Sequence, residues 1–369
     1  MLSLLLPASL LGLSYLTLSA AAPFTFSSNP TGNNFPNPSA QQILDIQRQA
    51  RGSLPNGAPP ARVTNDTLTS LRLIAFNEMF EVAYFTSLLN NITTNVPGYT
   101  FSNPTERASV LATLTAVQAQ EELHVLNANG ALAHFNQAPI QPCQYAFPVT
   151  DFPSAIALAA TFTDVVLGTL QDVATQFAAS GDGGLIRGLT SVIGQEGEQN
   201  GFYRVVQNKI PSALPFLTTS TREFAFSALN QDFVVPGSCD AANMASIALP
   251  VFGALTVETP SVEARGQMLD FSIGLQPTKG AIWTAQVGSA YEGLSVVYVN
   301  QQNTPVVQPM ANVRVTAEKV LFQANFPYDA SSFGNGLTLA VLARSDGMLG
   351  DLKGVADATV FGPGLIEIN

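Results

Sequence analysis

The sequence has few charged residues, and its basic residues form no run. Only 11% of the 369 residues are Asp, Glu, Lys or Arg, whereas 46% are hydrophobic. The 15 Lys and Arg residues are outnumbered by 26 Asp and Glu residues, which gives a formal net charge of -11. Such a chain offers no electrostatic footprint for phosphates, so we expect no nucleic-acid partner. The low charge is typical of a secreted protein with an uncharged polar surface.

Histidine is nearly absent, since only His124 and His134 occur. A Ser-His-Asp triad would have to recruit one of them, and no Gly-x-Ser-x-Gly turn is present. The phosphate-binding pattern Gly-x-x-x-x-Gly-Lys is also missing. Paired-carboxylate hydrolases stay open as a class because acids are plentiful, but no pair stands out. We therefore assign no catalytic residue.

Cysteine is equally scarce, with Cys143 and Cys239 as the two examples. They are too few and too isolated for a zinc site. In an oxidising compartment two cysteines most simply form one disulfide, and both lie in loop-like, proline-containing surroundings. The sequons at Asn65 and Asn91 predict glycosylation, which fits the same compartment.

The amino-terminal segment, residues 1–21, has the pattern of a signal peptide. An apolar run is followed by the small residues Ser19-Ala20-Ala21, which suit cleavage. A membrane anchor is the competing interpretation, but Pro7 and Gly12 break the run. We expect a secreted, extracellular protein, with no membrane association once the signal is removed.

The remaining chain divides into three parts. Residues 22–64 are rich in Pro, Asn, Gly and Ser and predict an extended arm with one short helix. Residues 65–239 contain four long helical patterns, the second ending near Asn129-Gly130. Residues 240–369 contain short alternating or β-branched runs, including 282–287, which predict a β-sandwich. The expected class is α+β multidomain, with an antiparallel four-helix bundle before the sandwich.

Acidic residues occur near the middle of all four long helices. Glu121 and His124 are three residues apart, so they share one helix face and can reach the same metal ion or proton. Glu122 should face another side and be solvated. We also expect that Glu78 and Glu81 do not both point inward without partners, because burying an unpaired carboxylate is costly.

The fourth helix contains four glycines: Gly188, Gly194, Gly197 and Gly201. Each glycine costs about 1 kcal/mol relative to alanine inside a helix. A repeated set therefore indicates either close packing of another segment or room for a ligand.

These motifs resemble the secreted ferritin-like proteins of fungi, which include late sexual development and stress-response proteins. The resemblance is carried by residues 77–85, by Glu121-Glu122-Leu123-His124 and by Glu196-Gly197-Glu198-Gln199. It implies a bundle with metal positions at Glu78, Glu121, His124, Asp164 and Glu196, and iron or manganese as the metal. Gln199 stands where the family pattern has a second histidine, and an amide is a poor ligand beside imidazole.

Two hypotheses follow for function. The favoured one is a scaffold or binding protein of fungal development or stress, with a degenerate metal site and a sandwich that attaches it to the cell wall or matrix. The alternative is an iron- or manganese-dependent oxidoreductase that handles peroxide or oxygen at the residual carboxylate and histidine site.

Overall fold

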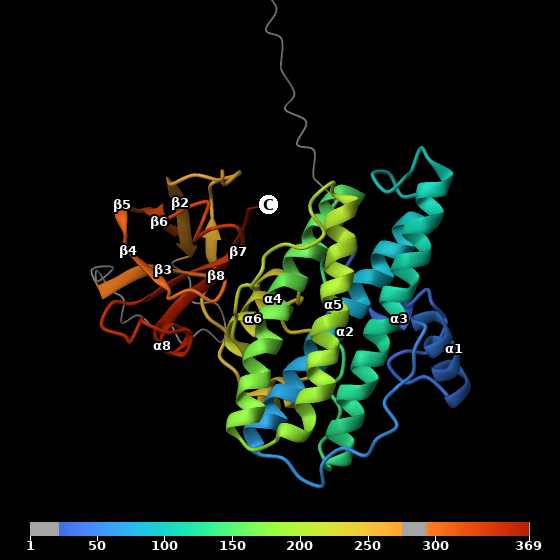
Figure 1. The fold of residues 1–369 in the computed structure, drawn as a ribbon. Helices are drawn as coiled ribbons and strands as arrows, with labels where there is room; N and C mark the ends of the chain where they lie inside the picture. The colour runs from blue at the N-terminus through green and yellow to red at the C-terminus, as the bar shows by residue number, and fades with distance from the viewer. Residues whose placement is uncertain (1–21, 275–292, 369) are drawn as a thin grey trace, which may run out of the picture.

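A computed structural model describes residues 22–274 and 293–368 (Figure 1). The signal-peptide prediction for 1–21 and the predicted strand at 282–287 lie outside the described residues. A helical part comes first and a part made of two sheets follows. The helices are α1 (Ala40–Ala50), α2 (Asn65–Thr93), α3 (Pro104–His134), α4 (Phe152–Ala179), α5 (Ile186–Val206), α6 (Arg222–Asp232), α7 (Ala241–Ile247) and α8 (Leu352–Ala358), with short 3-10 turns η1 (Phe26–Ser28) and η2 (Gly183–Leu185).

The long helices begin at capping residues that the sequence supplies. Asn103 accepts hydrogen bonds from the first turn of α3, with Pro104 following it, and Asp151 forms a capping box with Ser154 at the start of α4. The sequence predicted that this helix ends near Asn129-Gly130, but α3 continues to His134. One glycine costs a helix only about 1 kcal/mol, and the fully buried Leu132 lies beyond it.

Helix α2 lies at the centre of the helical part, against α3, α4, α6 and α7. Most of its circumference is buried, including Phe76, Phe80 and Phe85. Phe80 contacts the rings of Tyr145 and Phe162, which come from the loop after α3 and from α4. This aromatic packing fixes the helices around the polar residues of α2.

Cys143 and Cys239 form a disulfide across a sequence separation of 96. In the chain-entropy model, closing a loop of this length stabilises the fold by about 4 to 5 kcal/mol. Tyr145, two residues later, pairs with both Phe24 and Val234 through backbone bridges. The start of the arm is thereby attached to the covalently closed part of the chain.

The sheet part contains two four-stranded antiparallel sheets. Their orders are β1-β2-β6-β5 and β4-β3-β7-β8. One hydrophobic cluster includes buried side chains from both sheets, among them Phe271, Tyr298 and Phe322. The strands are β1 (Leu255–Val257), β2 (Gln267–Gly274), β3 (Leu294–Asn300), β4 (Val306–Pro309), β5 (Ala311–Val315), β6 (Lys319–Phe326), β7 (Gly336–Arg344) and β8 (Thr359–Ile368).

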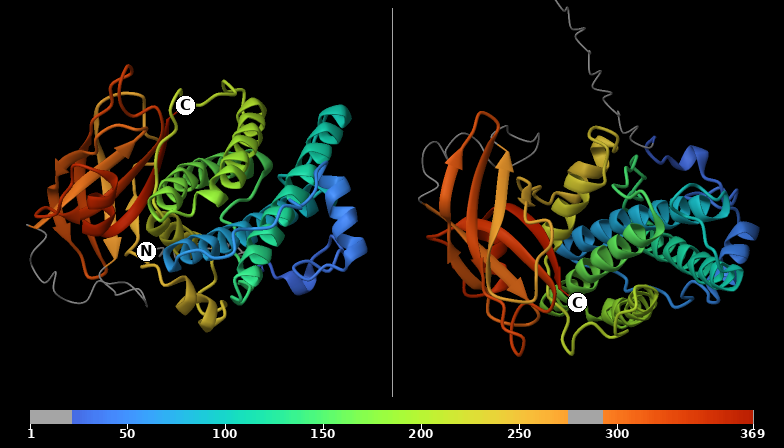
Figure 2. Two further views of the ribbon diagram at one scale, coloured as in Figure 1. Left: turned by 60° about the horizontal axis from the view of Figure 1, so that its bottom comes forward. Right: turned by 90° about the horizontal axis from the view of Figure 1, so that it is seen from above.

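The second sheet is also buried on its other face, where it meets the helices. Val297 and Leu339 belong to the same hydrophobic cluster as Val165 of α4 and Phe224 of α6. Figure 2 shows the sheets lying along one side of the helices. Continuous apolar strands such as β7, buried along nearly its whole length, reflect this covering of both faces.

Among the described residues, α4 is the one helix long and apolar enough to cross a membrane. Its most apolar window has a mean hydropathy of 1.4, and 72% of that window is buried inside the structure. A core helix of a soluble protein passes the same test, so this is weak evidence for a membrane span.

Candidate metal centre

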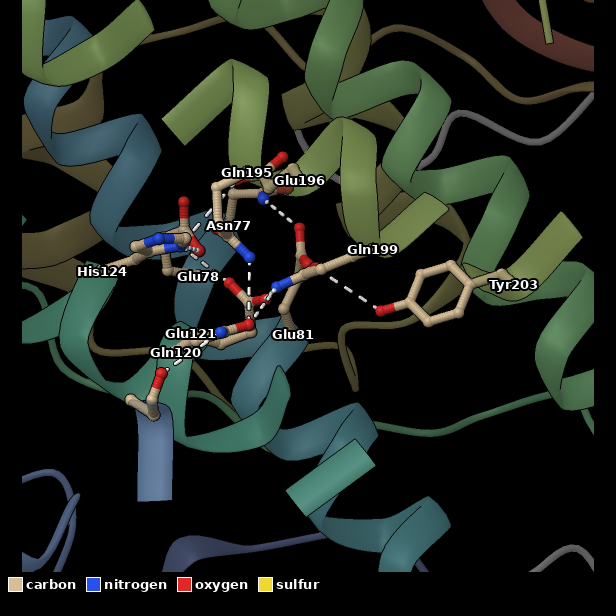
Figure 3. Close-up of polar contacts among 11 residues, drawn as sticks. Asn77, Glu78, Glu81, Gln120, Glu121, His124, Gln195, Glu196, Gln199 and Tyr203 are labelled. Carbon is tan, nitrogen blue, oxygen red and sulfur yellow. Dashed lines mark hydrogen bonds and ion pairs between the residues drawn. The ribbon is translucent and has the colours of Figure 1, made fainter. Parts of the chain in front are cut away.

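Three helices bring four of the expected ligands together. Glu78 comes from α2, Glu121 and His124 from α3, and Glu196 from α5, and each offers one ligand atom within 4.8 Å of the others (Figure 3). Glu121 and His124 meet because residues three apart lie on one helix face. The predicted face of α3 is therefore the face that the structure turns toward α2 and α5.

His124 is the nitrogen donor of the group. Its Nδ1 lies 2.8 Å from Glu121 Oε2, 3.4 Å from Glu78 Oε2 and 3.9 Å from Glu196 Oε1. The imidazole is 15% exposed, whereas the three carboxylates are at most 1% exposed. His124 thus stands on the side of the group nearest solvent.

Several carboxylate oxygens have no hydrogen-bond donor. Glu78 Oε2 and both oxygens of Glu196 are buried without a hydrogen-bond partner in the described structure. A buried carboxylate oxygen without a partner is expensive, and native proteins normally supply a donor or a cation. Of these oxygens, Glu78 Oε2 and Glu196 Oε1 lie within 4 Å of His124 Nδ1, so the donor set fits a cation between them.

Burial and mutual repulsion shift the pKa values of these groups. Burial raises the pKa of Glu78 to about 7, although His124 opposes the shift. Burial, followed by the charges of Glu78 and Glu121, raises the pKa of Glu196 well above its usual range. Burial alone would lower the pKa of His124, but the neighbouring Glu121 and Glu78 raise it well above its ordinary value. A divalent cation would replace protons as the charge that balances these carboxylates.

Glu81 is a fourth buried carboxylate beside the group, and the sequence pattern did not predict it there. It is 1% exposed and accepts a 2.8 Å hydrogen bond from Asn77 Nδ2 through Oε1, while its Oε2 has no hydrogen-bond partner. Burial and then the charges of Glu121, Glu196 and Glu78 raise its pKa well above the usual range. Glu78 and Glu81 both point inward, and Asn77 and His124 are the partners that permit it. Glu78 and Glu81 are three residues apart and so share one face of α2, and this spacing could have predicted that both approach the centre.

Gln199 lies at the group but acts as a donor. Its Nε2 donates to Glu121 Oε1 at 2.6 Å and to Gln120 Oε1 at 3.1 Å, while Tyr203 donates weakly to its Oε1 at 3.5 Å. The amide therefore fixes one oxygen of Glu121 and leaves the other for His124. The residue in the expected place of a second histidine holds a ligand instead.

Asp164 lies outside this group of four. It accepts a 2.9 Å hydrogen bond from Asn200 Nδ2 and interacts electrostatically with Arg204. Burial raises its pKa to about 7, and Arg204 opposes this. The acid of α4 thus belongs to a separate polar cluster between α4 and α5.

Glu122 is fully buried, which corrects the prediction that it is solvated. Asn33 of the arm donates through Nδ2 to both carboxylate oxygens, at 2.7 and 2.9 Å. Burial raises the pKa of Glu122 to about 7, and the amides of Asn33 and Gln118 oppose the shift. The prediction failed because the arm, 89 residues earlier, covers this side of α3.

The other sequence candidates lie away from the centre. His134, at the end of α3, is exposed and hydrogen-bonds through Nε2 to the carbonyl of Pro60 at 3.0 Å. Asn65 is exposed at the start of α2, while Asn91 is partly buried and hydrogen-bonds to Tyr99.

A family model described as a ferritin-like domain matches residues 62–209. This range contains α2 to α5 and all four residues of the candidate centre. The helical part therefore carries a ferritin-like domain, as the resemblance implied. No curated protein matches the chain.

Proposed function

We propose that this ferritin-like protein binds one transition-metal ion, iron or manganese, at Glu78, Glu121, His124 and Glu196. The observation that carries the proposal is the convergence of four ligand atoms within 4.8 Å, with buried carboxylate oxygens that lack a hydrogen-bond partner. Carboxylate and imidazole ligands suit these metals. Bound there, the metal would supply a Lewis acid and a redox couple for oxygen or peroxide.

The chain's own residues would have distinct tasks. Glu78 and Glu196 each offer an oxygen without a hydrogen-bond partner, and His124 offers Nδ1 when deprotonated. Gln199 orients Glu121 by donating to its other oxygen. The burial of the carboxylates excludes water from the group, while the exposed edge of His124 leaves one side near solvent.

The geometry supports one metal rather than two. The second half of a two-metal site would need ligands at 164 and 199, but Asp164 pairs with Asn200 and Gln199 donates to Glu121. Glu81 is the remaining nearby acid, and Asn77 occupies one of its oxygens. A single, altered site is the version of the degenerate centre that these contacts favour.

The wider role that we propose is that of a secreted scaffold of fungal development or stress. In this view α2 to α5 form a four-helix bundle, and the two sheets form a sandwich that binds a cell-wall or matrix component. The disulfide is compatible with an extracellular setting. The alternative is an oxidoreductase acting on oxygen or peroxide, and the buried carboxylate and histidine group is the observation that favours it.

Elemental analysis of the natively secreted protein tests the metal proposal. We expect about one equivalent of iron or manganese, and less than about one tenth of that in a Glu121→Gln, His124→Gln double variant. Asp164→Asn is the matched control, since it removes a buried acid that lies outside the group, and it should keep its metal. Metal-free wild-type protein from supplemented medium would exclude the site.

Two further measurements separate the scaffold from the enzyme. If the protein is a scaffold, the double variant should preserve the developmental or stress phenotype in the producing organism. If it is an oxidoreductase, the metal-loaded wild type should consume peroxide or oxygen, and the double variant should not.

A further inference from the structure

Gln120 connects the arm to the edge of the candidate centre. Its Oε1 accepts hydrogen bonds from two residues of α5, Gln195 Nε2 at 3.0 Å and Gln199 Nε2 at 3.1 Å. Its Nε2 donates to the carbonyl of Ala50, the last residue of α1, at 3.3 Å. Figure 3 shows Gln120 beside Gln199 and Glu121. Because Gln199 also donates to Glu121, a hydrogen-bonded path runs from α1 to a proposed metal ligand.

The carbonyl of Ala50 is an acceptor that α1 cannot satisfy by itself. A helix leaves its last four carbonyls without partners inside the helix. In the turn that follows, Arg51 has a left-handed backbone conformation (φ 57°), and the backbone N–H groups of the turn donate to the earlier carbonyls of Gln47 and Arg48. The side-chain amide of Gln120 supplies the donor for Ala50.

The direction of this first hydrogen bond decides the direction of the next two. A carbonyl only accepts, so Gln120 turns its NH₂ group toward α1 and its oxygen toward α5. Gln199 must then present its own NH₂ group to Gln120, and the same Nε2 donates to Glu121 Oε1 at 2.6 Å. The Tyr203 hydroxyl, beside Gln199 Oε1, can donate or accept and therefore does not fix this direction.

Without the Ala50 carbonyl, nothing on the α1 side keeps Gln120 in this orientation. A rotated Gln120 would present its NH₂ group to Gln199. Gln199 would then either lose its acceptor at Gln120 or reverse its amide and turn an oxygen toward the Glu121 carboxylate, which also only accepts. In both cases Glu121 is held less firmly. Loss of a group that orients a metal ligand typically weakens metal binding by about 10- to 100-fold.

Helix α1 is attached to α3 by a small apolar contact. Ile46 and Ala50 are its buried residues, and they share one hydrophobic cluster with Ala119 and Leu123 of α3. Residues 51–64, which connect α1 to α2, are mostly exposed and contain neither helix nor strand. Helix α1 can therefore leave α3 without unfolding the four long helices.

We propose that Gln120 is a positioning residue of the metal centre, and that the docking of α1 regulates metal affinity through it. Docked α1 keeps Gln199 as a donor to Glu121, which gives the centre its full affinity. Detached α1 leaves the same ligands in place but holds Glu121 less firmly, so the metal binds more weakly. This regulation rests on the proposed metal site.

The affinity for Mn²⁺, measured on the full protein by competition with a chelator, tests the proposal. Ile46→Asp should detach α1, because it places a charge in the apolar contact, and should lower the Mn²⁺ affinity about tenfold. Leu44→Asp is the matched control, since Leu44 of the same helix is 47% exposed, and it should bind Mn²⁺ like the wild type. Hydrogen exchange of the α1 amides shows whether the helix is docked.

Substitutions of Gln120 separate positioning from a general effect of packing. In Gln120→Glu the carboxylate only accepts, so it keeps Gln199 as a donor whether or not α1 is docked. We expect this variant to lose no Mn²⁺ affinity, and Ile46→Asp added to it should cause no loss either. Gln120→Met has no amide and should bind Mn²⁺ about tenfold more weakly than the wild type.

Three results would overturn the proposal. They are unchanged affinity in Ile46→Asp with α1 detached, unchanged affinity in folded Gln120→Met, and an equal loss from Ile46→Asp in the wild-type and Gln120→Glu backgrounds. If α1 stays docked in Ile46→Asp, Ala50→Asp is added to it, and if Gln120→Met does not fold, Gln120→Ala replaces it. Each of these results leaves the metal site itself intact. Wild-type protein that binds no Mn²⁺ would instead overturn the proposed metal site, and the regulation with it.

Discussion

The two helix pairs of the ferritin-like domain use their acids in different ways. Helices α2 and α3 direct Glu78, Glu121 and His124 to one point, whereas α4 and α5 contribute Glu196 alone. In the second pair Asp164 is held by Asn200, and Gln199 is turned into a donor to Glu121. The amides at 199 and 200 thus donate hydrogen bonds to carboxylates and are not part of the four-residue group.

Removing Glu196 should have the largest effect on metal affinity, because Glu196 is the one proposed ligand that α4 and α5 contribute. We expect Glu196→Ala to lower metal affinity by about 100-fold or more, which exceeds the roughly 10- to 100-fold loss typical when a residue that hydrogen-bonds to a metal ligand is changed. Competition with a chelator of known affinity measures this. Affinity unchanged from that of the wild type would show that α5 contributes no ligand.

Substitutions of Gln199 test whether its side-chain amide orients Glu121. Gln199→Leu removes the donor to Glu121 Oε1, so we expect roughly 10- to 100-fold weaker metal binding without a change in stoichiometry. Gln199→His should instead raise the metal content above one equivalent, since it places an imidazole three residues after Glu196. If both variants bind metal as the wild type does, Gln199 has no positioning role.

Asp164→Asn should change the pH dependence of folding stability without changing metal binding, which would show that the Asp164 cluster is separate from the centre. The folded-state pKa of Asp164 is raised from 3.8 to about 7, so the folded protein binds more protons than the unfolded chain between these values. Stability from this group is therefore full below about pH 4 and is lost as pH rises through 7. The asparagine variant should be more stable than the wild type at pH 8, by on the order of 1 to 4 kcal/mol.

Urea unfolding at pH 4 and pH 8 measures this difference, which should vanish at the lower pH. Lower stability of Asp164→Asn at pH 8 would mean that attraction to Arg204 outweighs burial. Wild-type and variant proteins should carry the same amount of metal at pH 8 in either case.

Glu122→Gln should have the smallest effect on the centre. It keeps the size of the side chain but replaces one acceptor of the Asn33 amide with a donor. We expect a loss of about 1 to 3 kcal/mol in stability, faster proteolysis near Asn33 and unchanged metal content. Unchanged proteolysis would show that this contact does not hold the arm.

Periodicity and capping residues were enough to find the long helices, and helical spacing was enough to pair Glu121 with His124. The sequence pattern alone could not predict which acid, Asp164 or Glu81, lies beside the centre. The answer depends on how α2 and α4 are rotated about their axes. That rotation is set by packing, such as the contacts of Phe80 with Tyr145 and Phe162. The prediction that Glu122 is solvated failed for a similar reason, since its partner Asn33 is far away in the chain.

The shared hydrophobic cluster of Val297 and Leu339 with Val165 and Phe224 has a consequence for attachment. This contact packs the second sheet directly against α4 and α6, so the helical part and the sheet part share a buried hydrophobic interface. If the sheets hold the protein on a wall or matrix, the helices stand on that support at one fixed orientation. The partly exposed His124 would then keep the same position relative to the attached sheets in every molecule.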